Sequence, residues 1–243
     1  MTETLFREEP YRRDCEARVR SVEAGGIVLD RTVFYPRGGG QAGDAGRLDL
    51  AGGNAIAVLD TVKGEGPADI LHVPAPGQEA ALAALGPGTP VTARIDWKRR
   101  HRHMRFHTAT HLLCAIVPKQ TNGCSITADY ARLDFDMTEL LDRETLEREL
   151  ARLVEEAHDV RTIWITDAEL DAKPELVRTM SVQPPRGVGR VRLLEIAGVD
   201  LQPCGGTHVA NTREIGALRV VKIEKKSARS RRVVLEFAKS GSG

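Results

Sequence analysis

The sequence contains no long run of apolar residues. No stretch approaches the roughly 20 apolar residues that span a bilayer, and residues 1–20 lack the apolar core of a signal peptide. We therefore expect a cytoplasmic protein with no membrane partner. Cysteine is also scarce. The four cysteines are scattered without tight pairing, which excludes a disulfide framework; they are Cys15, Cys114, Cys124 and Cys204.

Net charge is almost absent as well. The chain has 35 basic and 34 acidic residues, a formal net charge of +1 at pH 7. Any attraction for a polyanion must therefore come from local patches. The 243 residues are enough for one large domain or two modest ones, each with its own core, and we expect two.

The first domain is expected over residues 1–92. From Tyr11 to about Pro90 the sequence is rich in glycine and in short β-type runs separated by turn residues. This pattern predicts a small antiparallel β-barrel or sandwich. The predicted runs are CEARVRSV, GIVLD, TVFYP, GRLDL, AIAVLDTV and DILHV, with VTARIDW as a candidate last strand.

The second domain is expected over residues 93–239 and to be of the α+β class. Helical spacing of small and apolar residues predicts a helix over 99–117, which Pro118 would end, and a second helix within 136–160. Alternation between them predicts a strand or hairpin over 125–137. Further strands are predicted in RTIWIT, GRVRLLEIAG, GALRVVKIEKK and RRVVLEF. The closing SGSG, 240–243, is expected to be disordered or extraneous.

Two short motifs carry candidate metal ligands. In HTATHLLC, His107 and His111 are four residues apart, so a helix would place both imidazoles on one face. In CGGTH, Cys204 and His208 are also four apart, and the two glycines between them would let the backbone turn so that the two side chains converge. Three imidazoles and one thiolate are typical of a zinc site.

Each motif alone has a plainer interpretation. A pair of histidines on a helix arises easily by chance, and a glycine pair more often marks a turn. Their coincidence in a chain with seven histidines favours zinc. Cys114 shares the helix face with His107 and is a rival ligand, although its apolar surroundings favour a buried thiol. A peptidase of the HExxH kind is disfavoured, because Thr108 stands where that motif needs glutamate.

Two other features suggest binding. In RGGGQ, 37–41, three glycines allow close backbone approach to a substrate, and Gln41 offers a donor and an acceptor; a loose hairpin turn is the alternative. Two basic runs flank the metal motifs and could meet nucleic-acid phosphates, or could simply be solvated surfaces. No GxxxxGK[ST] motif occurs, so we expect no nucleotide cofactor. The basic candidates are Arg99, Arg100, Arg102, Lys225 and Lys226.

Four motifs together, FYPRGGGQAGDAG, HTATHLL, QPCGGTHV and NTREIG, resemble those of the freestanding alanyl-tRNA editing proteins of the AlaX type. They are similar also to the editing domain of alanyl-tRNA synthetase. The resemblance implies an N-terminal barrel-like domain with a glycine-rich loop, then an α+β editing domain shared with threonyl-tRNA synthetase. Arg37 departs from the smaller or acidic residue of that pattern. The family's zinc motifs fall on His107, His111, Cys204 and His208.

The resemblance further implies a hydrolase that removes serine, and in some members glycine, from mischarged alanine tRNA. A wall of the substrate pocket would then be formed by the glycine-rich loop, Gly38, Gly39, Gly40 and Gln41. Selecting serine over alanine requires a group that hydrogen-bonds the seryl hydroxyl. Candidates near the metal motifs are Gln41, the first choice, with Thr108, Thr110 and Thr207. A non-catalytic tRNA-binding module with a structural zinc ion remains the alternative.

Overall fold

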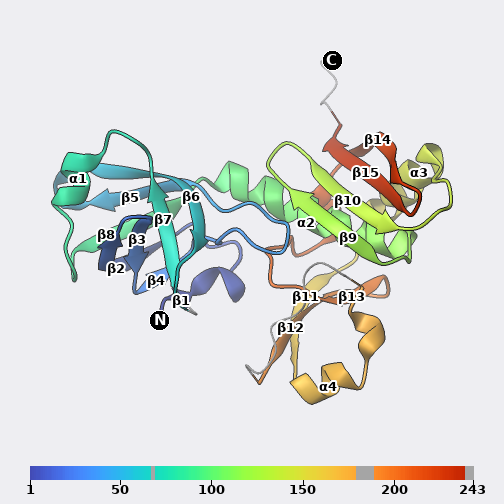
Figure 1. Ribbon diagram of the computed structural model, residues 1–243, viewed down its shortest axis with the longest axis horizontal. Coiled ribbons are helices and arrows are strands. Elements are labelled where there is room, and N and C mark those ends of the chain that lie inside the picture. Colours follow the sequence, from blue (N-terminus) through green and yellow to red (C-terminus); the bar gives the residue numbers. More distant parts are fainter. Residues whose placement is uncertain (67–68, 179–188, 239–243) are drawn as a thin grey trace. The chain divides into compact units, whose positions relative to one another are not determined.

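The computed structural model describes residues 1–66, 69–178 and 189–238, which form two compact units of mixed α+β structure (Figure 1). The first unit contains residues 1–38 and 42–101. The second contains residues 39–41 and the described residues from 102 onward. The closing SGSG lies outside the described residues. Within the described ranges, no helix combines the length and apolar character needed to cross a membrane.

The first unit is built on a closed six-stranded barrel. Its strands pair antiparallel in the order β2-β3-β7-β6-β5-β8. On β2, Cys15, Ala17 and Val19 point to the core while the residues between them face solvent, as the two-residue period of a strand requires. The strands are β2 (Asp14–Glu23), β3 (Gly26–Leu29), β5 (Gly46–Leu50), β6 (Ala55–Lys63), β7 (Ile70–Pro74) and β8 (Pro90–Ile95).

Short elements complete this unit. Strand β1 (Glu3–Thr4) pairs in parallel with β4 (Arg31–Thr32), and α1 (Glu79–Ala83) lies between β7 and β8 in the chain. The prediction of a strand over TVFYP was wrong beyond Thr32. The reason is that Phe34 N–H donates to the Thr32 hydroxyl and Tyr35 N–H to the Asp44 carboxylate, so these groups do not join a ladder.

The strand that crosses residue 92 belongs to the barrel. Strand β8 pairs with β2 from Pro90 to Arg94 and with β5 from Val91 to Ile95. The two compact units meet in the chain between His101 and Arg102, inside helix α2 (Trp97–Ile116). A functional domain boundary at residue 92 stays a prediction.

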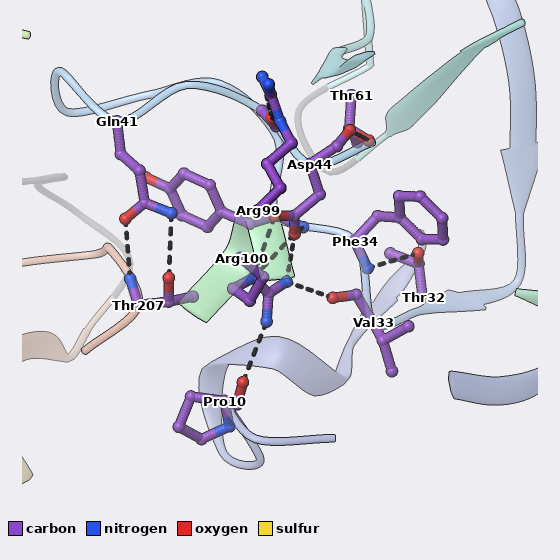
Figure 2. Close-up of polar contacts among 12 residues, drawn as sticks. Pro10, Thr32, Val33, Phe34, Gln41, Asp44, Thr61, Arg99, Arg100 and Thr207 are labelled. Atoms are coloured by element: carbon purple, nitrogen blue, oxygen red, sulfur yellow. Dashed lines mark hydrogen bonds and ion pairs between the residues drawn. The ribbon is translucent and has the colours of Figure 1, made fainter. Parts of the chain in front are cut away.

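Buried Arg100 holds the chain on both sides of the glycine-rich loop, through Val33 before it and Asp44 after it (Figure 2). The Arg100 side chain is 0 % exposed and its Nε donates to both Asp44 carboxylate oxygens, at 3.1 and 2.9 Å. Its terminal nitrogens donate to the carbonyl oxygens of Val33 at 2.6 Å and Pro10 at 3.1 Å. The guanidinium thus joins three segments of the first unit, and none of its nitrogens is left for an external phosphate.

The second unit combines two antiparallel sheets with helices. One sheet has the order β14-β15-β10-β9 and the other β11-β12-β13. Its strands are β9 (Thr121–Ile126), β10 (Ala131–Asp136), β11 (Val160–Ile165), β12 (Val191–Ile196), β13 (Asp200–Pro203), β14 (Leu218–Ser227) and β15 (Ser230–Phe237). Its further helices are α3 (Arg143–Glu155) and α4 (Asp167–Asp171).

Helices α2 and α3 are built differently. In the second unit, α2 is buried on nearly every side, with Phe106 stacked on Phe237 of β15 at a centroid distance of 3.9 Å. Helix α3 buries only one stripe, Leu146, Leu150 and Leu153, and its N-terminus is capped by the Asp142 carboxylate. A helix buried all round can carry polar side chains only where they have partners, which makes the histidines of α2 informative.

Removing the buried guanidinium should destabilise the barrel. We expect Arg100→Met to lower the free energy of unfolding by about 3 to 5 kcal/mol, because it leaves the Asp44 carboxylate buried without its cation. The matched control is Arg99→Met, whose partly exposed side chain makes only long bonds, of 3.3 and 3.4 Å, to Gly43 O. It should cost about 1 kcal/mol or less. Urea denaturation of both variants measures the difference, and equal midpoints would contradict it.

Candidate metal centre

Four side chains converge in the second unit. The nearest ligand atoms of His107, His111, Cys204 and His208 all lie within 4.8 Å of one another. The Cys204 Sγ is 3.4 Å from His107 Nε2 and 3.2 Å from His208 Nε2. The three histidines are less than 8 % exposed, whereas Cys204 is half-buried. The two motifs predicted from sequence therefore meet at one point.

Local structure explains how each pair is presented. His107 and His111 are one helical turn apart on α2, with ring centroids 5.6 Å apart. Cys204 and His208 follow β13 in a loop without regular structure. A β-carbon on Gly206 would lie 2.2 Å from His107 Cε1, so only glycine lets the loop approach that ring. A β-carbon on Gly205 would meet nothing within 4 Å.

Each imidazole is held through its Nδ1 by a residue outside the group of four. His107 Nδ1 donates to Gln41 Oε1 at 2.7 Å, and His111 Nδ1 donates to Asp200 Oδ2 at 2.8 Å. Thr108 Oγ1 gives its proton to Met104 O, so at 3.3 Å it accepts from His208 Nδ1. In the neutral rings this pattern keeps the proton on Nδ1, so that each Nε2 can bind a metal ion once any proton on it is released.

The glycine-rich loop delivers Gln41 to the second unit. Ile126 N donates to Gly40 O at 2.8 Å, and Gln41 forms a parallel bridge with Ile126, so residues 39–41 extend the edge of β9. Gly40 has φ +84° and its β-carbon would lie 2.7 Å from Cys124 Sγ. Gln41 then bonds Thr207 through both ends of its amide (Figure 2): Nε2 donates to Oγ1 at 2.9 Å, and Oε1 accepts from the backbone N–H at 3.1 Å.

The loop from Cys204 to Gly206 is held by a buried arginine. Arg192, on β12, is 7 % exposed, and its Nη1 donates to Cys204 O at 2.8 Å and Gly206 O at 3.0 Å. Its Nη2 donates to the Thr162 hydroxyl at 2.9 Å. Cys204 N–H returns a bond to Arg192 O. Arg192 therefore fixes the carbonyl side of the cysteine loop.

The electrostatics of the group favour a thiolate. Burial alone would raise the pKa of the Cys204 thiol, but electrostatic attraction and hydrogen bonds from the neighbouring imidazoles outweigh it and hold this pKa well below 9.0. Burial lowers the pKa of His111, yet its hydrogen bonds to Asp200 and Cys204 raise it to about 10. Burial and the neighbouring imidazole of His107 hold the pKa of His208 well below 6.5.

The donor set fits a zinc ion. Three imidazole Nε2 atoms and one thiolate match the ligands that tetrahedral zinc prefers, and the Nδ1 partners are of the kind that orient such ligands. Cys114, the rival ligand, lies outside the group of four; it is 7 % exposed and burial raises its pKa to about 12. The identity of the ion is a matter for the proposal below.

Comparisons with known proteins agree with this geometry. Residues 191–234 match the family model described as threonyl and alanyl tRNA synthetase second additional domain, and residues 6–99 match class II (A) tRNA synthetases. The alanyl-tRNA editing protein AlaX-M of Methanosarcina mazei is 35 % identical over 100 % of this chain and 99 % of its own length. The chain belongs to the alanyl-tRNA editing protein family. It is thus an enzyme, a hydrolase.

Other relatives have the same region within longer chains. The alanyl-tRNA editing protein AlaX-L of Pyrococcus horikoshii is 32 % identical over 93 % of this chain and 56 % of its own length. The alanine–tRNA ligase of Metallosphaera sedula is 38 % identical over 92 % of this chain but only 25 % of its own length. Members of this editing family and part of a ligase therefore share the sequence that forms both compact units.

The polar residues predicted to contact the substrate are buried beside the candidate metal centre. Gln41, Thr108 and Thr207 are each 0 % exposed. The Gln41 amide bonds His107 and Thr207, and the Thr108 hydroxyl bonds Met104 and His208, so both orient candidate metal ligands. A direct substrate contact by either residue stays a prediction. The Thr110 hydroxyl donates to His107 O.

The three glycines predicted to line the substrate pocket also differ from one another. Gly38 lies in the first unit, where its carbonyl oxygen accepts from the Tyr35 hydroxyl. Gly39 and Gly40 belong to the second unit, and both have positive φ, +58° and +84°. Gly40 packs against Cys124, whereas Gly39 is exposed. Gly38 and Gly40 therefore shape the loop, and a substrate contact through the exposed backbone of Gly39 stays a prediction.

Two important residues escaped sequence reasoning. Asp200 holds His111, and its own oxygens accept from Gln202 Nε2 at 3.0 and 2.8 Å. Arg192 holds the cysteine loop. An acidic residue four positions before Cys204, at the start of the short strand β13, was a detectable signal for Asp200. Nothing local marked Arg192, because it lies in a run of alternating residues typical of any half-buried strand.

The two glycines of CGGTH should differ in their tolerance of a side chain. We expect Gly206→Ala to lower zinc affinity by about tenfold or more, because the methyl group would displace the His107 ring from its place. Gly205→Ala is the matched control and should bind zinc like the unmodified chain. Competition with a chromophoric chelator measures both affinities. Equal zinc binding by the two variants would show that His107 is not confined by the loop.

Proposed function

We propose that this hydrolase removes serine, and glycine as a second substrate, from mischarged alanine tRNA in a zinc-dependent ester hydrolysis in the cytoplasm. The single observation that supports it most is the convergence of three oriented imidazoles and a thiolate in a chain that matches an alanyl-tRNA editing protein over its whole length. Aminoacyl esters are activated, so a positioned water and a polarised carbonyl suffice without a covalent nucleophile.

His107, His111, Cys204 and His208 would hold the zinc ion. When bound, zinc supplies Lewis-acid polarisation at the site. The chain's own residues prepare the site: Gln41, Asp200 and Thr108 fix the imidazoles, and half-buried Cys204 with exposed Gly205 marks its solvent-facing side. An ester can approach there without displacing a side chain, because Gly205 has none.

A structural zinc ion in a non-catalytic tRNA-binding module is the second candidate. A closed four-ligand site favours it, since such sites usually stabilise a fold. Membership of a hydrolase family and the half-exposed cysteine argue against it. The distinction is chemical: a purely structural ion leaves the ester intact.

One assay tests the function and its preference. Alanine tRNA is charged separately with serine, glycine and alanine, and loss of each ester is followed with the zinc-loaded chain. We expect rapid loss of the seryl ester and slower loss of the glycyl and alanyl esters, because both of these lack the hydroxyl that the site is proposed to engage. Stable seryl and glycyl esters would instead support the binding module.

Gln41 provides a sharper test of the site. The Gln41 amide bonds His107 and Thr207. We therefore expect Gln41→Ala to slow hydrolysis of the seryl and glycyl esters by the same factor, about tenfold, and to weaken zinc binding. Gln120→Ala, at an exposed position just before β9, is a control of the same chemistry. A variant that slows only the seryl ester would show that Gln41 reads the hydroxyl after all.

The basic residues remain proposed phosphate contacts with one exception. Lys225 and Lys226 are exposed at the end of β14, and Arg99 and Arg102 are partly exposed. Arg102 also donates to Ala128 O and lies over the Phe237 ring at 4.9 Å. Arg100 is set aside, because its guanidinium is buried against Asp44.

Charge reversal separates a tRNA contact from a solvated surface. Lys225→Glu with Lys226→Glu should weaken tRNA binding and reduce the slope of log affinity against log salt by about 1 to 2. Arg148→Glu with Arg152→Glu makes the same charge change on exposed positions of α3 and serves as control. Filter binding at several salt concentrations gives both slopes. An unchanged slope in the β14 variant would leave these lysines as ordinary surface residues.

A further inference from the structure

Arg192 holds two peptide groups of the cysteine loop by their carbonyl oxygens. The carbonyl oxygens of Cys204 and Gly206 both accept from the same nitrogen, Nη1 of Arg192, at 2.8 and 3.0 Å. These carbonyls belong to the peptide groups that end in the N–H of Gly205 and of Thr207. One buried guanidinium therefore fixes the orientation of two alternate peptide planes.

A trans peptide places its N–H opposite its carbonyl oxygen, and the described chain contains no cis peptide. Both N–H groups must therefore point away from Arg192. Thr207 N–H does so and reaches Gln41 Oε1, the same atom that holds His107. Gly205 N–H also points away from Arg192 and, among the described residues, has no hydrogen-bond acceptor.

The surroundings of Gly205 leave this donor accessible. Gly205 is exposed, and a β-carbon there would meet no atom within 4 Å. It directly follows the one ligand of the four that is only half-buried. A preorganised backbone N–H beside a reaction centre is the usual donor to the oxygen of an acyl group under attack.

We propose that the backbone N–H of Gly205 stabilises the negatively charged carbonyl oxygen formed when the ester of aminoacyl-tRNA is hydrolysed. This assignment rests on the proposed function. It adds a catalytic group, Gly205 N–H, and a positioning residue, Arg192, which orients that group. Thr207 N–H donates to Gln41 Oε1 and therefore has a structural role instead.

The step is a simple acyl transfer to water. The water oxygen forms a bond to the ester carbon, and the carbonyl electron pair moves to the oxygen that Gly205 N–H faces. When that pair returns, the bond between carbon and the ribose oxygen breaks. One water proton ends on the ribose hydroxyl, and the other is released to solvent as the free carboxylate forms. The hydrogen bond strengthens only while the oxygen carries its charge, so it acts on kcat.

Removal of one proton-bearing backbone nitrogen tests this assignment. In Gly205→Pro the N–H is lost. A second variant carries glycolic acid at position 205, introduced by nonsense suppression, so that a backbone ester replaces the amide with no added atoms in the side chain. Zinc content, thermal unfolding, kcat and KM on seryl-tRNA are measured for all of them.

We expect the glycolic acid and proline variants to lose kcat by about 100-fold, with zinc content and KM unchanged, whereas glycolic acid at Gly52, an exposed glycine of the first unit, should leave kcat within about threefold of the unmodified chain. Should proline disturb the loop, the backbone ester alone decides. Unchanged kcat in the backbone ester variant overturns the assignment while leaving the proposed function standing. No deacylation by the unmodified chain overturns the proposed function and this assignment with it.

Discussion

A single buried amide joins the parts of the metal centre. Gln41 lies on a glycine-rich loop, and its side chain bonds His107, 66 residues later, and Thr207, 166 residues later. The bond to His107 selects the tautomer that leaves Nε2 for the ion, and the bonds to Thr207 place the segment that carries Cys204 and His208. Gln41 thus adds a second link between helix α2 and the segment of Cys204 and His208, beside the one between Thr108 and His208.

The glycines near the centre have distinct physical roles. Gly40 is required because its φ is +84° and because its β-carbon would overlap the Cys124 sulfur. Gly206 is required because the His107 ring occupies the space of a side chain. Gly205 has neither constraint, and its lack of a side chain leaves the solvent-facing side of the site open. The motif CGGTH therefore contains one glycine for packing and one that keeps access.

Arginines in similar sequence surroundings have different structural roles. Arg99 and Arg100 are neighbours in one basic run, yet Arg99 is partly exposed while Arg100 is enclosed by a carboxylate and two carbonyl oxygens. Arg192 supports the cysteine loop, and Arg231, in the second basic run, donates to the carbonyl oxygens of Glu139 and Ser227. A guanidinium carries five donors in a rigid fork, so it satisfies several buried carbonyls at once.

The sequence by itself determined the local features of this protein: the alternation that forms β2, the helix that presents His107 and His111 on one face, and the group of four candidate metal ligands, which spacing and ligand chemistry predict together. It could not determine the Nδ1 partners. Asp200 reaches His111 across 89 residues, and the amide of Gln41, predicted to contact the substrate, bonds His107 and Thr207. Only the tertiary structure decided these roles and the burial of Arg100, because hydrogen bonds between distant segments depend on how the chain packs, and composition and periodicity report only on neighbours in sequence.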